Sequence, residues 1–404
     1  MTKAELETLV KRLAYALRHA FRIGHSEPGQ DVVTCISSNH LLLPAIFLAT
    51  VGAGGIYSSA SPTLTVPELT RQIQSSSSRL IIASKDLQET VAEAARICGI
   101  SPERVLILHP MSGRRMLASL ASPAHNHLDE INELPWETIT DAETLRTRTI
   151  GLLFSSGTTG PPKGASLSHQ NFVAECIITQ ALFATYLGRA RRRLHVDFEY
   201  RTIAHLPAAH IAGLQGYFLN GIMCGGTVFW MPKFVFKDFV AASRRHRPTF
   251  LTTAPATYLR IAKSPDVTDE FHSLEFAQSG AAPIGHELQK LAEAKLKCPI
   301  IHSWGMTETT GAMTWLPLDE VDDTCSIGKL LPNARMKIVD DEGVSVPDGE
   351  AGEILVRGPN VMIGYWNNPS ATREALTEDG WLRTGDIGLR RRGNFYIVDR
   401  KKVR

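Results

Sequence analysis

The chain has 404 residues, and at roughly 150 residues per domain this length predicts two or three domains with enough surface to bury a core. The composition, 43% hydrophobic, 21% charged and 7% aromatic, is that of an ordinary soluble globular protein. Because 43 Lys and Arg face 41 Asp and Glu, the net charge of +2 predicts neither a nucleic-acid partner nor a membrane-surface partner.

The chain begins with the pattern of an amphipathic helix. Apolar residues recur at three- and four-residue steps through Met1–Gly24. A mitochondrial presequence has a similar pattern, but Glu5 and Glu7 argue against an acid-poor targeting peptide. Further on, the longest apolar stretch, Leu41–Gly52, contains Pro44 and is shorter than the roughly 20 residues of a membrane span. We therefore expect a structural helix and no membrane span.

Apolar strands then alternate with helices. Asp31–Ser37 and Val105–Leu108 are expected strands, and Asn39–Val51 is an expected helix. The same alternation of apolar strands and helices is found between Ile203 and Ser303. Apolar strands separated by helices are typical of parallel sheets covered on both faces. The predicted fold is α/β, with two mostly parallel sheets flanked by helices in αβαβα layers.

The pattern changes from about Cys325. Three short strands, Ala334–Asp340, Glu353–Arg357 and Phe395–Val398, are separated by turns rich in Gly, Asp and Asn. This predicts a small antiparallel, β-barrel-like subdomain. The expected division is residues 1–324 for the α/β part, 325–398 for the small β part, and 399–404 for a hinge stub.

The cysteines and a run of arginines predict structural features and no chemistry. Six scattered cysteines without a C-x-x-C pair predict reduced core residues rather than disulfides or a zinc site. Four arginines between residues 189 and 193 are compatible with a nucleic-acid patch, but the low net charge favours a solvated loop over Gly188–Tyr200.

The stretch that carries chemistry follows the apolar run Ile150–Phe154. Six consecutive glycine or hydroxyl residues are followed by two prolines and Lys163. Glycines allow successive backbone N–H groups to turn inward around an anion, hydroxyls add donors, and the lysine adds a positive charge. A helix expected from about Ser168 adds its N-terminal dipole. The spacing is not that of a Walker loop. The six residues are Ser155, Ser156, Gly157, Thr158, Thr159 and Gly160.

This string resembles the phosphate-loop signature of the adenylate-forming, AMP-binding superfamily, which includes acyl-CoA synthetases, coumarate–CoA ligases, beetle luciferases and peptide-synthetase adenylation domains. Five further segments resemble the family's motifs in the right order. They are Leu206–Gly213 (LPAAHIAG), Ser279–Pro283 (SGAAP), Trp304–Thr309 (WGMTET), Gly380–Asp386 (GWLRTGD) and Tyr396–Arg400 (YIVDR).

The resemblance implies a role for each segment in binding ATP and Mg²⁺. Main-chain groups of Gly280, Ala281 and Ala282 would contact the adenine, and Trp304, where the family often has Tyr, would stack on it with Gly305 and Met306 alongside. Asp386 and Arg400 would bind the ribose. Thr307 would contact the α-phosphate, Glu308 would help to hold Mg²⁺, and His210 would orient the acid. Lys163, His210, Thr307 and Glu308 form the expected catalytic set.

The implied reaction is ATP-dependent activation of a carboxylic acid to an acyl-adenylate, followed by transfer to coenzyme A. A carboxylic acid with a pKa of roughly 4–5 is already ionised at neutral pH, so positioning and charge neutralisation are required rather than a general base. The small residues around His210 and at Ala281–Ala282 favour an aromatic or medium-to-long acid, although they equally suit helix–sheet packing.

Relatives continue beyond the position of Arg404 with a further domain of about a hundred residues that carries a second lysine. We therefore expect either a fragment of a ligase or a truncated product with low activity. A non-catalytic nucleotide-binding module is the alternative from another class. An amino-acid adenylation domain is disfavoured by Trp304–Met306 and Trp381–Arg383, and a luciferase-like oxygenase shares the same motifs. The expected location is cytoplasmic, or peroxisomal where the natural C-terminus carries that address.

Overall fold

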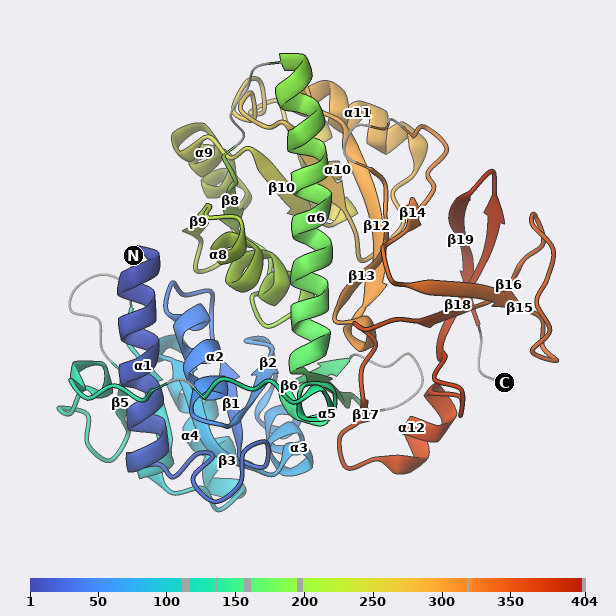
Figure 1. Cartoon of the computed structure of the whole chain (residues 1–404). Helices are drawn as coiled ribbons and strands as arrows, with labels where there is room; N and C mark the ends of the chain where they lie inside the picture. The colour runs from blue at the N-terminus through green and yellow to red at the C-terminus, as the bar shows by residue number, and fades with distance from the viewer. Residues whose placement is uncertain are drawn as a thin grey trace. The chain divides into compact units, whose positions relative to one another are not determined.

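A computed structural model describes residues 1–110, 117–135, 137–155, 161–194, 199–317, 320 and 322–401, without the side chains of 186–194. The chain divides into two compact units. Unit 1 comprises Met1–Gln170, Pro207–Leu214 and Met362–Asn368, and unit 2 comprises Asn171–Leu206, Gln215–Val361 and Pro369–Arg404. Each unit therefore combines segments that are distant in the sequence (Figure 1).

Unit 1 is built on an eight-stranded sheet with the order β17-β7-β6-β2-β1-β3-β4-β5. Its centre, from β6 to β4, is parallel, and the pairs β17–β7, β7–β6 and β4–β5 are antiparallel. The strands are β1 (Val32–Ile36), β2 (Ile56–Ala60), β3 (Ser78–Ser84), β4 (Val105–Leu108), β5 (Leu117–Ser119), β6 (Thr149–Ser155), β7 (Lys163–Ser168) and β17 (Gly364–Tyr365).

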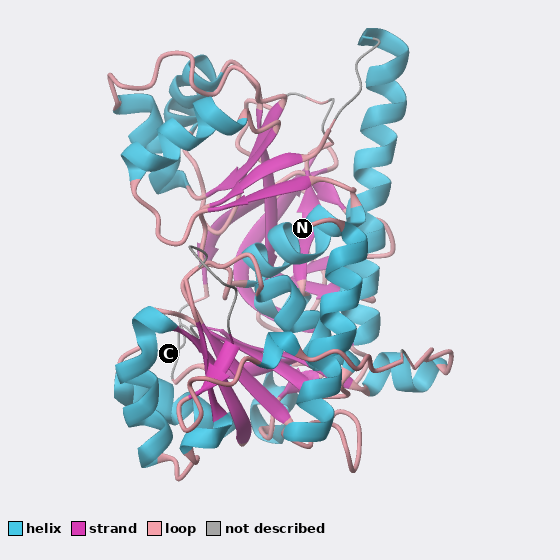
Figure 2. Ribbon diagram, turned by 90° about the vertical axis from the view of Figure 1, so that its left-hand side faces the viewer, coloured by secondary structure: helices cyan, strands magenta, loops and turns pink. Residues whose placement is uncertain are grey.

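Helices flank this sheet (Figure 2). The helices are α1 (Lys3–Ala20), α2 (Leu43–Gly52), α3 (Val66–Ser76), α4 (Gln88–Ile97), α5 (Ala142–Thr147) and α7 (Ile211–Gly213), with 3₁₀ turns at η1 (Lys85–Leu87), η2 (Pro102–Arg104) and η3 (His127–Asp129). Leu69 and Ile73 of α3 and Val91 of α4 pack on Ile81 of β3 and Ile107 of β4 in one apolar cluster. The predicted N-terminal helix is confirmed as α1, whose Thr2 and Glu5 form a capping box.

Unit 2 contains a five-stranded sheet in the order β10-β11-β12-β13-β14, parallel from β10 to β12 and antiparallel beyond. A separate parallel pair joins β8 to β9. The strands are β8 (Arg201–Ala204), β9 (Thr227–Trp230), β10 (Phe250–Thr253), β11 (Phe276–Ser279), β12 (Ile300–Met306), β13 (Gly311–Trp315) and β14 (Lys329–Leu330), with η5 (Thr307–Thr309) between β12 and β13.

The helices of unit 2 surround these strands. Phe239 of α9, Tyr258 of α10 and Leu296 of α11 share a buried apolar cluster with Leu251 of β10 and Ala277 of β11. The helices are α6 (His169–Leu194, from Asn171 onward in this unit), η4 (Leu214–Asn220, a π-helix that begins in unit 1), α8 (Gly221–Met223), α9 (Phe236–His246), α10 (Pro255–Lys263), α11 (His286–Leu296) and α12 (Pro369–Ala375).

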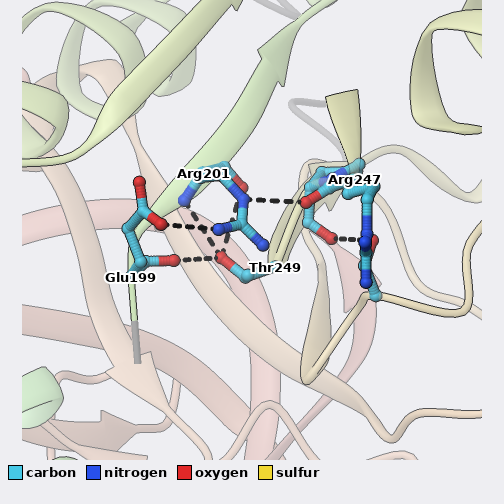
Figure 3. Close-up of polar contacts among 6 residues, drawn as sticks. Glu199, Arg201, Arg247 and Thr249 are labelled. Atoms are coloured by element: carbon cyan, nitrogen blue, oxygen red, sulfur yellow. Dashed lines mark hydrogen bonds and ion pairs between the residues drawn. The ribbon is translucent and has the colours of Figure 1, made fainter. Parts of the chain in front are cut away.

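Polar contacts fix the start of β8 beside the start of β10 (Figure 3). The Thr249 hydroxyl donates to the Glu199 carbonyl at 2.6 Å and accepts from the Arg201 backbone N–H at 3.0 Å. The Arg201 side chain donates to the Arg247 carbonyl at 2.9 Å and pairs with the Glu199 carboxylate at 2.6 Å. These contacts set the registration of two strands that lie almost fifty residues apart in the chain.

The late part of unit 2 is an antiparallel four-stranded sheet, as predicted. Its strands β15 (Arg335–Val339), β16 (Gly352–Arg357), β18 (Leu382–Arg391) and β19 (Asn394–Arg400) pair in the order β15-β16-β18-β19. The α/β class is therefore confirmed. Barrel-like closure and the division at residue 324 remain predictions.

One element prediction was wrong, because α6 runs on to Leu194 where a loop from Gly188 was expected. Arg, Ala and Leu are good helix formers, so the local charge density was a misleading signal. All six cysteines are unpaired, and Cys35, Cys176 and Cys298 are buried. No helix in the described part of the chain combines the length and the apolar character that crossing a bilayer requires.

Candidate functional site

Lys163 lies at the start of β7, directly opposite Ser155 at the end of β6. Its Nζ lies 5.3 Å from the centre of the Tyr365 ring, a cation–π contact from the neighbouring strand β17. Both Lys163 and Ser155 are half-buried. The other predicted cradle residues, Ser156, Gly157, Thr158, Thr159 and Gly160, lie outside the described residues, so the cradle itself remains a prediction.

His210 lies in unit 1 on a tight turn before α7. The turn is held by a hydrogen bond from Ala208 N to Asn39 Oδ1 at 2.8 Å and by another from Ser59 Oγ to the Ala209 carbonyl at 2.7 Å. Gly213 is required here, because a Cβ on it would lie 2.4 Å from the Pro207 carbonyl oxygen. The His210 side chain is exposed, yet the protein atoms around it desolvate the ring and lower its pKa below the ordinary value. The imidazole is therefore neutral at pH 7.

In unit 2, the separately predicted side chains of Trp304 and Arg400 both contact the carboxylate of a third, Asp386. Trp304 Nε1 donates to Asp386 Oδ2 at 2.8 Å, and Arg400 Nε pairs with Asp386 Oδ1 at 2.8 Å. Asp386 is buried, Trp304 is half-buried, and Arg400 is exposed. Each carboxylate oxygen retains a second lone-pair site, so the pair of oxygens can still accept hydrogen bonds from a diol. The tryptophan N–H thus gives the ring a polar contact with this carboxylate.

The predicted adenine-contacting segment follows β11. Gly280 lies close to the hydroxyl of Ser303 on β12, and Ala281 has a left-handed φ of 67°. The side chain of Gln278, two residues before Gly280, accepts a hydrogen bond from the Thr252 hydroxyl at 2.9 Å and donates one to the Ser303 hydroxyl at 2.7 Å. The segment therefore begins at a strand end that these hydrogen bonds hold in place, and Ala281 and Ala282 within it are exposed. Exposed backbone groups at a strand end are available to a ligand.

Thr307 and Glu308 lie on η5, directly after β12, and both are buried. The Thr309 hydroxyl accepts from Met306 N at 2.9 Å and donates to the Gly311 carbonyl at 2.7 Å, which closes the turn. Gly305, on the strand before it, is exposed and passes so close to Gly311 that a Cβ would meet its carbonyl oxygen at 1.9 Å. Glu308 therefore lies in the narrow turn between β12 and β13, which we call the 307–312 corner.

Glu308 fits a metal role only in part. A carboxylate oxygen is the ligand type that Mg²⁺ prefers. Among the described residues, however, no group of three or more His, Cys, Asp and Glu side chains is arranged to hold a metal ion. An ion at Glu308 would therefore need most of its ligands from elsewhere, such as phosphate oxygens and water.

Glu175 on α6 is the residue that the sequence analysis missed. The residue is 2% exposed, and its carboxylate accepts from Ala312 N at 3.0 Å and from Asn360 Nδ2 at 3.1 Å. Burial raises its pKa from an ordinary 4.5 to about 8. A signal was available, because Glu175 falls within the buried helix face of Phe172, Cys176 and Thr179, where an acid is unexpected.

Comparison with known proteins gives one consistent picture. The model of the family described as AMP-binding enzyme matches residues 1–366. A protein from Emericella nidulans described as an acyl-coenzyme A synthetase is 46% identical over 402 residues, covering 100% of this chain and 72% of that protein. The 4-coumarate–CoA ligase 3 of Oryza sativa is 32% identical, covering 99% and 69%. The crystal structure of ATP-bound MatB from Rhodopseudomonas palustris matches with a TM-score of 0.80 at 27% identity, covering 99% and 73%.

Proposed function

Because the chain belongs to the family of AMP-binding enzymes, we propose that the residues described above bind ATP and a carboxylic acid for acyl-adenylate formation. The protein is an AMP-forming acid–thiol ligase of the acyl-CoA synthetase type, and its reaction uses ATP, Mg²⁺ and coenzyme A. What remains to be tested is which of its residues perform each step, and on which acid.

The residue assignment rests on the contacts that the Asp386 carboxylate makes. Trp304 and Arg400 come from different motifs, yet both contact this one buried group. A stacking ring, a buried carboxylate and an arginine in contact are the groups that a purine nucleoside requires. We assign the adenine to Trp304, with main-chain contacts at Gly280–Ala282, and the ribose to Asp386 and Arg400.

The chemistry of the first step is the approach of an anion to a polyanion. The acid's carboxylate oxygen bonds to the α-phosphorus, and the bond from that phosphorus to the bridging oxygen of pyrophosphate breaks. Lys163 neutralises phosphate charge, Thr307 hydrogen-bonds the α-phosphate, and neutral His210 orients the acid without removing a proton. Mg²⁺, when bound, supplies further charge neutralisation, and Glu308 would be its protein ligand.

In the second step the sulfur of coenzyme A bonds to the acyl carbon. AMP leaves with the electron pair of the broken carbon–oxygen bond, and the thiol proton passes to solvent. This step needs no further oxidant or reductant. The products are the thioester and AMP.

We propose an aromatic or medium-to-long acid as the substrate. The turn around His210 carries Ala208, Ala209 and Ala212, and the strand end after β11 carries Ala281 and Ala282, and side chains this small favour a larger acid. The rice relative is named for an aromatic acid, 4-coumarate. A cytoplasmic location is also proposed, since unpaired cysteines suit a reducing compartment.

Acid-dependent exchange of pyrophosphate into ATP tests the function. We expect exchange with 4-coumarate, phenylacetate or octanoate, little with acetate, and a loss of roughly a hundredfold or more in K163A, since a positioned charge on the phosphates is removed. Equal exchange by K163A would contradict the assignment of Lys163. Nucleotide binding without exchange for any acid would instead favour the non-catalytic module.

A further inference from the structure

The corner that presents Thr307 and Glu308 has an unfavourable backbone. Directly after η5, Thr310 has φ 57° and Gly311 has φ 147°, two successive residues in the region that L side chains rarely adopt. The chain then enters β13 at Gly311. Residues in such conformations persist only where surrounding contacts hold them.

Glu175 supplies those contacts from a different element, α6. One carboxylate oxygen accepts from Ala312 N at 3.0 Å, and a Cβ on Gly311 would lie 2.6 Å from the same oxygen. The other oxygen accepts from Asn360 Nδ2 at 3.1 Å. The carboxylate thus lies directly against Gly311 and Ala312, the residues that follow Thr310, whose φ of 57° is unfavourable for a β-branched side chain.

Asn360 closes the network on the other side of the corner. The Asn360 Nδ2 also donates to the Ala312 carbonyl at 3.1 Å, and the backbone carbonyl of Asn360 accepts from the Thr310 hydroxyl at 2.7 Å. Residues 310 to 312 are therefore held by the side chains of Glu175 and Asn360 and by the Asn360 backbone carbonyl, from two segments that lie 185 positions apart in the chain. All of these groups belong to unit 2.

General stability is a poor reason for an acid at this position. A buried carboxyl group is destabilising when it ionises without a partner, and no ion pair joins Glu175 to a Lys or Arg in the described part of the chain. A leucine on this helix face would fill the space at lower free energy. What an apolar side chain lacks is an acceptor for the Ala312 N–H and for the Asn360 amide.

We propose that Glu175 is a positioning residue, which with Asn360 holds the 307–312 corner so that Thr307 and Glu308 receive a magnesium-bound nucleotide. This inference rests on the proposed function and adds a residue that contacts neither nucleotide nor metal. Side chains that orient a metal ligand typically change metal affinity by roughly 10- to 100-fold when they are replaced.

The test compares E175Q with the matched control E270Q. Glutamine keeps an acceptor for Ala312 N but places its NH₂ opposite Asn360 Nδ2, so one hydrogen bond becomes a contact between two donors. Glu270 is another buried carboxylate of unit 2 that accepts backbone N–H bonds, at 2.7 Å from Thr268 and 3.1 Å from Asp269, in a different part of the sequence. A second variant, N360A, removes the partner instead.

Three measurements are made on the full chain at pH 9, above the pKa of about 8, so that Glu175 is ionised and both of its oxygens accept hydrogen bonds. ATP affinity is titrated against Mg²⁺ by calorimetry, adenosine affinity is measured in EDTA, and amide exchange is followed over residues 307–312. For E175Q and N360A we expect roughly tenfold more Mg²⁺ for half-maximal ATP affinity, faster exchange at 307–312, and adenosine affinity within about twofold of the original. E270Q should match the original chain in all three.

The contrary outcomes are distinct. An unchanged Mg²⁺ requirement in both E175Q and N360A, alongside normal ATP binding by the original chain, overturns this inference alone, because Glu175 would then have only a structural role. An equal loss of adenosine affinity also overturns it, since the effect would not be confined to the corner. An original chain that binds neither ATP nor adenosine overturns the proposed function, and this inference with it.

Discussion

At the scale of single residues, the contact between Trp304 and Asp386 explains why an indole suits this position. The N–H on the edge of the ring reaches the carboxylate at 2.8 Å, which fixes the plane of the ring that would stack on adenine. A hydrogen bond to a charged group contributes about 1.5–3 kcal/mol, more than a bond between neutral groups. The orientation of the ring and the hydrogen bonding of one of the two Asp386 carboxylate oxygens thus depend on the same contact.

W304F and W304L separate these two roles. The phenyl ring keeps a stacking face but loses the N–H donor, whereas leucine loses both. We expect W304F to lower the free energy of unfolding by about 1–3 kcal/mol while weakening adenosine binding by roughly tenfold or less. W304L should weaken binding further. Calorimetric titration and urea denaturation measure both, and equal binding by the two variants would exclude stacking.

The raised pKa of Glu175 predicts a specific pH dependence of stability. Between its ordinary 4.5 and about 8, the folded chain keeps this proton while the unfolded chain releases it. The stabilisation is therefore complete below pH 4.5, declines as pH rises, and is lost above about pH 8, with a slope of up to about 1.4 kcal/mol per pH unit. Urea unfolding of the original chain and E175Q at pH 6, 7, 8 and 9 gives the difference between them, which should fall up to pH 8 and then level off. Parallel curves would contradict this protonation.

How far the site is predictable from sequence depends on the distance along the chain that each feature spans. Thr307 and Glu308 belong to a short local motif, so they could be predicted without a structure. The pairing of Glu175 with Asn360 joins positions 185 apart, and no local pattern contains both. The link between Trp304 and Asp386 was missed for the same reason, although each residue was found separately.

At the scale of elements, the hairpin of β12, η5 and β13 is closed by two glycines. A Cβ on Gly305 would collide with the Gly311 carbonyl oxygen, and a Cβ on Gly311 would collide with the Glu175 side chain. Gly311 carries two constraints at once, because its φ is 147° and its neighbour is the Glu175 carboxylate. A side chain there is opposed both by backbone strain and by steric contact.

G311A therefore has a natural control in G343A, since Gly343 also has a positive φ, 83°, but a Cβ added to it would meet nothing within 4 Å. Strain alone should make G343A about 1–2 kcal/mol less stable. G311A should lose roughly 1–3 kcal/mol more through the contact with Glu175, and its ATP affinity should become more dependent on Mg²⁺. Thermal and urea unfolding test the first expectation, and equal losses in the two variants would show that the contact relaxes.

Sequence patterns identified elements according to how apolar they are. Val32–Ile36 and Val105–Leu108 are nearly uninterrupted apolar runs, and both are strands. Ile56–Ala60 was missed because it contains two serines, although every residue in it is buried between parallel neighbours. Lys163–Ser168 was missed because its antiparallel partner β6 lies across the glycine-rich segment, and such pairing leaves no local period. Burial imposed by the sheet thus overrides local composition.

At the scale of the whole molecule, the predicted nucleotide residues are divided between the two units. Lys163, Ser155 and His210 lie in unit 1, whereas Trp304, Asp386 and the 307–312 corner lie in unit 2. The division assigns the triphosphate lysine to one unit and the nucleoside residues to the other. Ligands that differ only in their phosphates should therefore stabilise different segments.

Hydrogen exchange with adenosine, AMP and ATP·Mg²⁺ tests this division. Because binding stabilises whatever contacts the ligand, adenosine should slow exchange around Gly280–Ala282, Trp304 and Asp386, and AMP should extend the protection to Thr307. ATP·Mg²⁺ should add protection at the start of β7, where Lys163 lies. In K163A this last protection should disappear while that around Asp386 remains. Protection of β7 by adenosine alone would contradict the assignment, because a ligand without phosphates has nothing for Lys163 to bind.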